Sequence, residues 1–166
     1  DSGSGKSTLC KILAGYENNY QGNVSMDGKK IVSKRYNPVQ LVFQHPEKAV
    51  NPKWKMKDIL NEGHQASQDI LDSFGIKKSW LNRWPNELSG GELQRFALAR
   101  ALGSETRYLI ADEITTMLDA ITQAQIWNTV LDVVKDRNIG VLVVSHEKNL
   151  IKKLCHEVVY LKDINN

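Results

Sequence analysis

The segment that most constrains this chain is Asp1–Thr8, with the sequence DSGSGKST. Gly3 and Gly5 permit backbone conformations closed to other residues, so successive amide N–H groups can point at phosphate oxygens. The Lys6 amine can reach the β- and γ-phosphates of a nucleotide, and the Ser7 hydroxyl suits Mg²⁺. A flexible linker could share this composition, but it would not run directly into an amphipathic helix. We therefore predict a phosphate-binding loop formed by Ser2, Gly3, Ser4, Gly5, Lys6, Ser7 and Thr8.

Such a loop requires a preceding strand to fix its position, and Asp1 already lies inside the motif. The loop's usual opening glycine would come one residue earlier. We therefore expect the sequence to be part of a longer protein, and the 166-residue chain alone to bind nucleotide weakly.

Composition limits the remaining possibilities. The chain has 166 residues, of which 41% are hydrophobic, enough for one globular domain over residues 1–166. A net charge of +3, spread along the chain, gives little reason to expect nucleic acid as a partner. Cys10 and Cys155 lie far apart and form no metal-binding motif, so we expect two free thiols. No apolar run is long enough to span a membrane.

Apolar runs alternate with segments of helical periodicity, which predicts an α/β fold with a mostly parallel sheet covered on both faces. Strands are expected at residues 41–43, 108–111, 141–144 and 158–161, and helices at residues 9–16, 93–101, 126–134 and 150–154. Gly15 is placed to end the first helix, and Asp27-Gly28 predicts a hairpin turn. Arg100 interrupts the apolar face of the helix at 93–101.

Residues 45–88 differ from their surroundings, because the pattern there is mostly helical and holds three of the four tryptophans. This stretch predicts a helical subdomain inserted between two parts of the sheet and continuing into the next helix. Trp80 and Trp84 lie four residues apart, which favours their burial inside this subdomain over a role in docking a partner.

Polar residues follow three of the predicted strands. Gln44 follows the first, the pair Asp112-Glu113 the second, and His146 the third. Ligands of open α/β sheets bind outside the carboxyl ends of the strands, so we expect these residues to converge with Lys6. The Asp112 carboxylate suits Mg²⁺, Glu113 can polarise an attacking water, and His146 is expected to contact the γ-phosphate.

A second candidate site lies at Ser89-Gly-Gly-Glu92, before the apolar helix. A capping box accounts for Ser89 and Glu92 but leaves the pair Gly90-Gly91 without a purpose. Two glycines at a helix start expose amide donors that suit an anion. Because one domain binding one nucleotide needs only one such cradle, this one is predicted to bind the γ-phosphate held by a partner molecule.

Over nearly its whole length the chain resembles the ATP-binding subunits of ABC transporters. The phosphate loop at residues 1–8 matches the family's Walker A loop, Leu88–Glu92 its signature motif and Tyr108–Glu113 its Walker B strand. Gln44 matches the Q-loop glutamine, Thr116–Asp119 the D-loop and His146 the switch histidine. This resemblance implies a P-loop NTPase fold that binds ATP and Mg²⁺.

The resemblance also implies a role for each residue. Glu113 and His146 would be catalytic, and Ser7, Gln44 and Asp112 would hold Mg²⁺. ATP would contact the loop residues 2–8, together with Gln44, Ser89, Gly90, Gly91, Glu92 and Asp119. Two such subunits would form a head-to-tail dimer, and the helical subdomain would pass its motion to transmembrane permease subunits. The protein would then be cytoplasmic, at the inner face of the cell membrane, without spanning it.

Four segments are similar to the dipeptide, oligopeptide and nickel import group: Phe43–Pro46, Asn51-Pro52, Glu92–Phe96 and Met117–Ile126. Two residues depart from the family pattern. Ile114 replaces the usual proline after the catalytic glutamate, which is expected to loosen Glu113 modestly. Glu92 replaces the commoner glutamine of the signature motif, a variant compatible with this group.

Two alternatives remain. A soluble ABC-type ATPase could act on ribosomes or DNA, although the short insertion between Lys6 and Ser89 differs from the long coiled coil of chromosome-type members. A regulatory cassette could bind ATP without hydrolysing it, although Lys6, Asp112, Glu113 and His146 are all intact.

Overall fold

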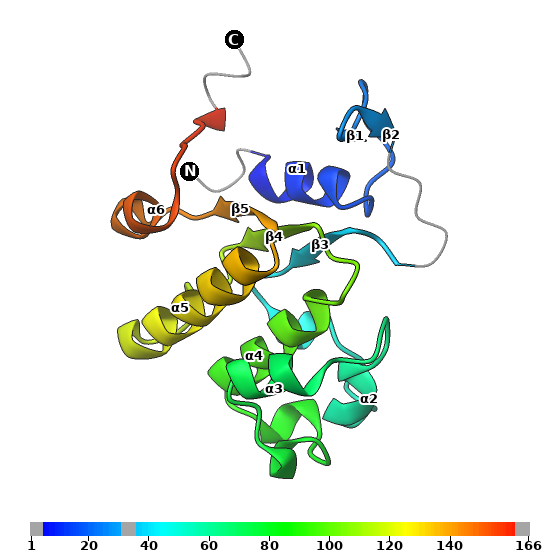
Figure 1. Ribbon diagram of the computed structural model, residues 1–166, viewed down its shortest axis with the longest axis vertical. Helices are drawn as coiled ribbons and strands as arrows, with labels where there is room; N and C mark the ends of the chain where they lie inside the picture. Colours follow the sequence, from blue (N-terminus) through cyan, green and yellow to red (C-terminus); the bar gives the residue numbers. More distant parts are fainter. Residues whose placement is uncertain (1–4, 31–35, 162–166) are drawn as a thin grey trace.

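The computed structural model describes residues 5–30 and 36–161. Its centre is a three-stranded parallel sheet in the order β3 (Val39–Val42), β4 (Tyr108–Asp112) and β5 (Gly140–Val144). The register pairs Val42 with Ala111 and Asp112 with Val144, so the carboxyl ends of the strands lie at one edge (Figure 1). The predicted α/β fold and three of the four predicted strands are confirmed.

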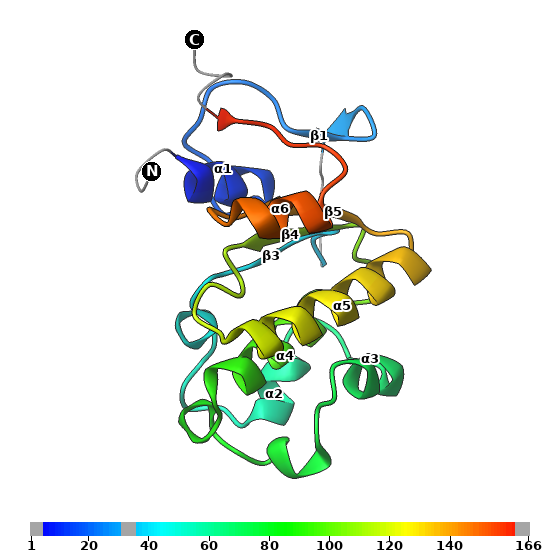
Figure 2. The same cartoon turned by 90° about the vertical axis from the view of Figure 1, so that its left-hand side faces the viewer.

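Helices cover both faces of this sheet, as Figures 1 and 2 show. Helix α1 (Lys6–Leu13) lies on one face, where Cys10 packs with Leu41 and Ile110. Helices α4 (Gly90–Ala101) and α5 (Ala120–Asp136) lie on the other, over Leu109 and Ala111. Strands covered on both faces need apolar residues on both, which explains the apolar runs of β3 and β4. Strand β5 is only partly buried, and its Leu142 is exposed.

The predicted hairpin and helix end are both present. Strands β1 (Ser25–Met26) and β2 (Lys29–Lys30) pair antiparallel, and Asp27 and Gly28 have φ angles of 52° and 73°. Two positive φ values are the mark of the tight type I′ turn that joins hairpin strands. Gly15, with φ 75°, follows the end of α1.

Between β3 and α4 the chain forms only short helices. They are η1 (Pro46–Lys48), α2 (Met56–Leu60), α3 (Gln68–Ser73), η2 (Lys78–Trp80) and η3 (Pro85–Glu87). Trp80 is buried beside Phe96, as predicted. The predicted burial of Trp84 is wrong, because this residue is 40% exposed and its ring lies under the Lys55 amine.

The predicted strand at residues 158–161 is also wrong. After α6 (Lys148–Leu154), residues 158–160 have no regular secondary structure and are exposed. A strand requires a neighbour for its backbone hydrogen bonds, and among the described residues β5 pairs with β4 alone. An apolar groove of about 890 Å³ separates β5 and α1 from this segment. The described part of the chain contains no helix with the length and hydrophobicity of a membrane span.

Candidate active site

The start of α1 is built to face an anion. Gly5 adopts a φ of 85° and directs the chain into the helix, whose first turn holds Lys6, Ser7 and Thr8. Within the described residues, no side chain caps this turn and no acidic residue lies in it. The first-turn N–H groups and the positive end of the helix dipole therefore suit phosphate. Ser2, Gly3 and Ser4 lie outside the described residues.

Asp112, the last residue of β4, lies at the end of the sheet and is 7% exposed. Burial, together with the Asp112 carboxylate, raises the pKa of the Cys10 thiol to about 12. Cys10 belongs to α1 and packs with Ile110 of β4. Asp112 comes two residues after Ile110 and so faces the same side of the sheet as α1. Cys10 and Cys155 are both free, as predicted.

Glu113 and His146 meet directly. The Glu113 N–H donates to the Val144 carbonyl at 2.9 Å, which extends the contact between β4 and β5 by one residue. Glu113 then turns sharply, with a φ of 52°. Its Oε1 lies 2.7 Å from His146 Nε2, in a pair whose side chains are 15% and 48% exposed respectively. The structure thus brings together two residues that the sequence assigns to separate strand ends.

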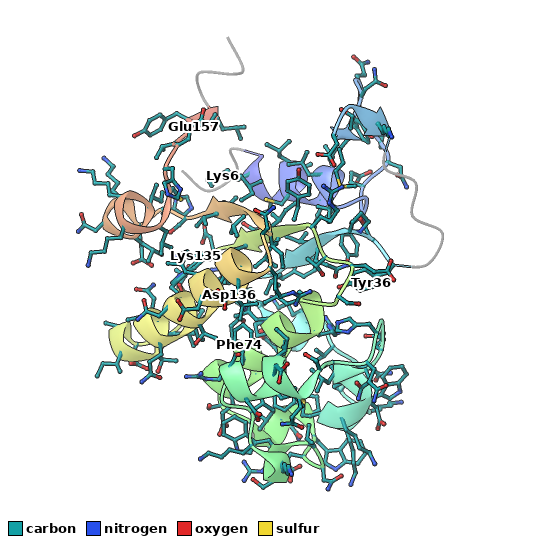
Figure 3. The ribbon with its side chains drawn as sticks, in the orientation of Figure 1. Lys6, Tyr36, Phe74, Lys135, Asp136 and Glu157 are labelled. Carbon is teal, nitrogen blue, oxygen red and sulfur yellow. The ribbon has the colours of Figure 1, made fainter. Side chains whose placement is uncertain are left out.

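Lys6 lies at the same end of the sheet, at the start of α1. Lys6, Val144 and Ser145 line the apolar groove beside β5. Figure 3 shows Lys6 at the end of the sheet where β5 leads toward α6. Gln44 follows β3 at the same edge, two residues beyond Val42. The turn after Glu113 is anchored by Ile114, which is 3% exposed in the core.

The predicted Mg²⁺ ligands have suitable chemistry. Ser7, Gln44 and Asp112 supply hard oxygen donors with a single carboxylate. The described residues hold no cluster of three or more histidine, cysteine or acidic side chains that would form a complete metal cage. Mg²⁺ commonly binds through one or two carboxylates, water and substrate phosphates, so this donor set fits the ion in the company of a nucleotide.

The second candidate site lies elsewhere in the fold. Ser89 caps α4: its Oγ accepts from Glu92 N at 3.3 Å, and Ser89 N donates to Glu92 Oε2 at 2.8 Å. The capping box is therefore present. Helix α4 lies on the opposite side of the sheet from α1 (Figure 1), so Ser89–Glu92 and Lys6 do not share a site within one chain.

Packing gives Gly91 a purpose that the sequence did not reveal. A Cβ atom at this residue would lie 2.9 Å from Thr122 Cγ2, at the start of α5. Helix packing thus gives Gly91 a structural role that the capping box does not. At Gly90 a Cβ would meet Leu118 at an ordinary 3.8 Å.

Asp119 caps α5 next to this contact. Its carboxylate accepts from the backbone of Ile121 and Thr122 and from the Thr122 hydroxyl, the last at 2.6 Å. The hydrogen bond from the Thr122 hydroxyl does most to lower the pKa of Asp119, and the backbone bonds lower it further. Asp119 thus belongs to the surface formed by the starts of α4 and α5, away from Lys6.

The sequence did not predict the side-chain hydrogen bonds to Thr115, two residues after Glu113. Thr115 is 2% exposed, and its Oγ1 accepts from Trp127 Nε1 at 3.0 Å and from Gln123 Nε2 at 3.1 Å. Gln123 and Trp127 are four residues apart on α5, on one face of that helix. A buried tryptophan N–H usually finds a partner, but the sequence does not indicate which one.

Comparison with known proteins settles the family. A family model described as ABC transporter matches residues 1–116, including the phosphate loop, the signature segment and Glu113. The chain belongs to the ABC transporter family. This agrees with the order of motifs along the sequence and with the P-loop type of α/β fold.

Curated relatives match almost the whole chain. It is 30% identical to the oligopeptide transport ATP-binding protein OppF of Streptococcus mutans, over 95% of this chain and 58% of that protein. It is 32% identical to the nickel import ATP-binding protein NikE of Shigella boydii, over 96% of this chain and 67% of that protein. The chain thus spans little more than half of the first relative and two thirds of the second.

A solved structure has the same fold. It is a dimeric, post-hydrolysis state of the ATP-binding cassette MJ0796 bound to ADP and Pi. The TM-score is 0.73 at 25% sequence identity, over 90% of this chain and 73% of that one.

Proposed function

We propose that this ABC transporter family member binds and hydrolyses ATP as the ATPase subunit of an importer. The observation that carries the proposal is the 2.7 Å contact between Glu113 and His146. It lies at the carboxyl ends of β4 and β5, where Lys6 and Ser145 line one groove. A carboxylate next to a phosphate-binding helix start, paired with a histidine that can reach the same phosphate, suits the activation of water.

Each residue has a distinct part in this mechanism. The Lys6 amine and the first-turn amides of α1 hold the β- and γ-phosphates. Glu113 orients a water molecule in line with the γ-phosphate, and His146 fixes the Glu113 carboxylate while contacting the phosphate. Ser7, Gln44 and Asp112 would hold Mg²⁺, which would neutralise phosphate charge when bound.

We also propose that a second ATP-binding subunit completes the site. Helices α1 and α4, which begin at Lys6 and Gly90, lie on opposite sides of the sheet (Figure 1). A nucleotide on one loop could therefore meet a signature motif only from another molecule. A head-to-tail pair would bring Ser89, Gly90, Gly91, Glu92 and Asp119 toward the γ-phosphate. The dimeric state of the cassette bound to ADP and Pi supports this arrangement.

The transported cargo is proposed to be a peptide or nickel. The names of the two relatives support this class, and a methionine import ATP-binding protein of Staphylococcus saprophyticus at 31% identity also supports import in general. Transmembrane permease subunits would then be the partners, and residues 45–88 the subdomain that contacts them. The protein would act at the cytoplasmic face of the membrane, with no nucleic acid involved.

ATP hydrolysis by the full-length protein tests this proposal. Glu113→Gln should lower kcat by about 100-fold or more, because a general base contributes at least that factor. The same variant should retain ATP and accumulate as a dimer. Lys6→Ala should weaken ATP binding or hydrolysis, as measured by nucleotide titration and phosphate release.

Glu105→Gln provides the control, since Glu105 is an exposed carboxylate in the turn before β4. Its turnover should equal that of the unaltered protein. Brisk hydrolysis by Glu113→Gln would overturn the role of Glu113, and full activity in Lys6→Ala would overturn the phosphate loop.

A further inference from the structure

Glu113 and His146 lie in two turns that the sheet alone does not hold together. Backbone pairing between β4 and β5 ends with the bond from Glu113 N to the Val144 carbonyl. Beyond it the Glu113 backbone turns through a positive φ, while the chain after β5 passes through Ser145 to His146. The 2.7 Å contact between the two side chains therefore depends on groups that fix both turns.

One side chain on α5 contacts both turns. The Gln123 Nε2 atom lies 3.1 Å from Thr115 Oγ1 and 3.1 Å from Glu147 Oε1. Thr115 is two residues after Glu113, and Glu147 directly follows His146. An amide NH₂ carries two donors, so Gln123 can make both hydrogen bonds at once.

The Gln123 side chain thus bridges Thr115 and Glu147, and further hydrogen bonds hold each residue of this bridge in place. Thr115 is 2% exposed, and its Oγ1 also accepts from the buried Trp127 Nε1 at 3.0 Å. Gln123 sits in the first turns of α5, where its N–H bonds to the Asp119 carbonyl at 2.9 Å. The Glu147 N–H donates to Ser145 Oγ at 3.0 Å, which shapes the turn around His146. The bridge therefore links a rigid helix to each turn at a defined point.

We propose that Gln123 is a positioning residue that holds Glu113 and His146 in register for ATP hydrolysis. This inference rests on the proposed function. Gln123 acts through Thr115 and Glu147: in the described part of the chain its side chain bonds to these two residues, and not to Glu113 or His146. Because misplacement by about 1 Å can cost about 100-fold in rate, loss of this bridge should act on kcat.

The test replaces the donor with an acceptor in the full-length protein. Gln123→Glu keeps the size of the side chain but sets two carboxylates against each other at Glu147. We expect kcat to fall about 10- to 100-fold while the KM for ATP stays within about twofold, since the phosphate loop is untouched.

A reciprocal exchange separates positioning from general damage. In the double variant Gln123→Glu/Glu147→Gln the amide and the carboxylate change places, and the Thr115 hydroxyl can donate instead of accepting. This variant should recover kcat to within about threefold of the unaltered protein. Asn128→Asp, an exposed change on the same helix, should leave both kcat and KM unchanged and controls for added negative charge.

Hydrogen–deuterium exchange provides a readout that does not require hydrolysis. Gln123→Glu should raise amide exchange in residues 113–118 and 145–148, and the reciprocal exchange should reverse it. If the unaltered protein does not hydrolyse ATP, the proposed function fails, whereas the bridge is still judged by this exchange pattern. Unchanged kcat and exchange in Gln123→Glu, or a reciprocal variant as impaired as the single one, would overturn the inference.

Discussion

Gly91 of α4 packs against Thr122 at the start of α5. A side-chain carbon there would lie 2.9 Å from the Thr122 methyl carbon, well inside van der Waals distance. The glycine is thus required for packing, whatever its amide binds. Gly90 has no such constraint, since its added carbon would sit 3.8 Å from Leu118. A glycine that suits a ligand can equally serve a helix contact.

Gly91→Ala should therefore destabilise the protein by about 1–3 kcal/mol, the usual range for overpacking. Adding Thr122→Ser removes the methyl group but keeps the hydroxyl that bonds to Asp119, so the double variant should regain most of the loss. Urea denaturation measures both effects.

Gly90→Ala is the matched control, and its free energy of unfolding should not fall, because alanine favours helix and meets only an ordinary contact. A double variant no more stable than Gly91→Ala would show that the Thr122 contact is not the cause.

Helix α4 is fixed at its far end by a charged residue that interrupts its apolar face. Arg100 donates to the Ala49 carbonyl and to Glu62 Oε2, each at 3.1 Å. Its own carbonyl lies 2.7 Å from His64 Nε2. Arg100 thus joins α4 to the ends of η1 and α2, which explains why a cation is tolerated on this face.

Arg100→Met should cost about 1.5–3 kcal/mol, because it removes a charged donor from a partly buried carbonyl. Glu62→Gln should cost less than about 1 kcal/mol, since the Glu62 side chain is 51% exposed and keeps an acceptor. Thermal and urea unfolding compare the two variants. Equal losses would mean that the ion pair, and not the Ala49 contact, is what matters.

The three central strands were predictable from their apolar runs, which are typical of parallel strands. Each of them has a neighbouring strand to pair with. Residues 158–161 have the same apolar character, but no described strand lies beside them to accept their hydrogen bonds. Trp80 and Trp84 are likewise indistinguishable by spacing, although only Trp80 packs into the core.

In the candidate site, positions at strand ends were predictable because parallel register brings them to one edge. Asp112, Glu113 and His146 follow from that geometry, and the 2.7 Å contact confirms the convergence of the last two. The bridge from Gln123 was not predictable, since side-chain bonds between a helix and two turns depend on tertiary packing. No sequence period encodes them.

The two helix starts that contain glycine, at α1 and α4, lie far from each other in the fold. Helices α1 and α4 lie on opposite faces of the sheet, so a single chain cannot close both around one nucleotide. In the proposed head-to-tail dimer, both helix starts would share one nucleotide. The proposed roles of Lys6 and of Ser89–Glu92 both depend on this assembly.

Photo-crosslinking of the full-length Glu113→Gln protein tests that claim most directly. A photoreactive residue at Asn86, exposed three residues before Ser89, would report what approaches the signature motif. In a mixture of isotope-labelled and unlabelled subunits, ATP should produce crosslinks from this residue to residues 5–11 of the other subunit. Crosslinks confined to one subunit, or unaffected by ATP, would contradict head-to-tail assembly.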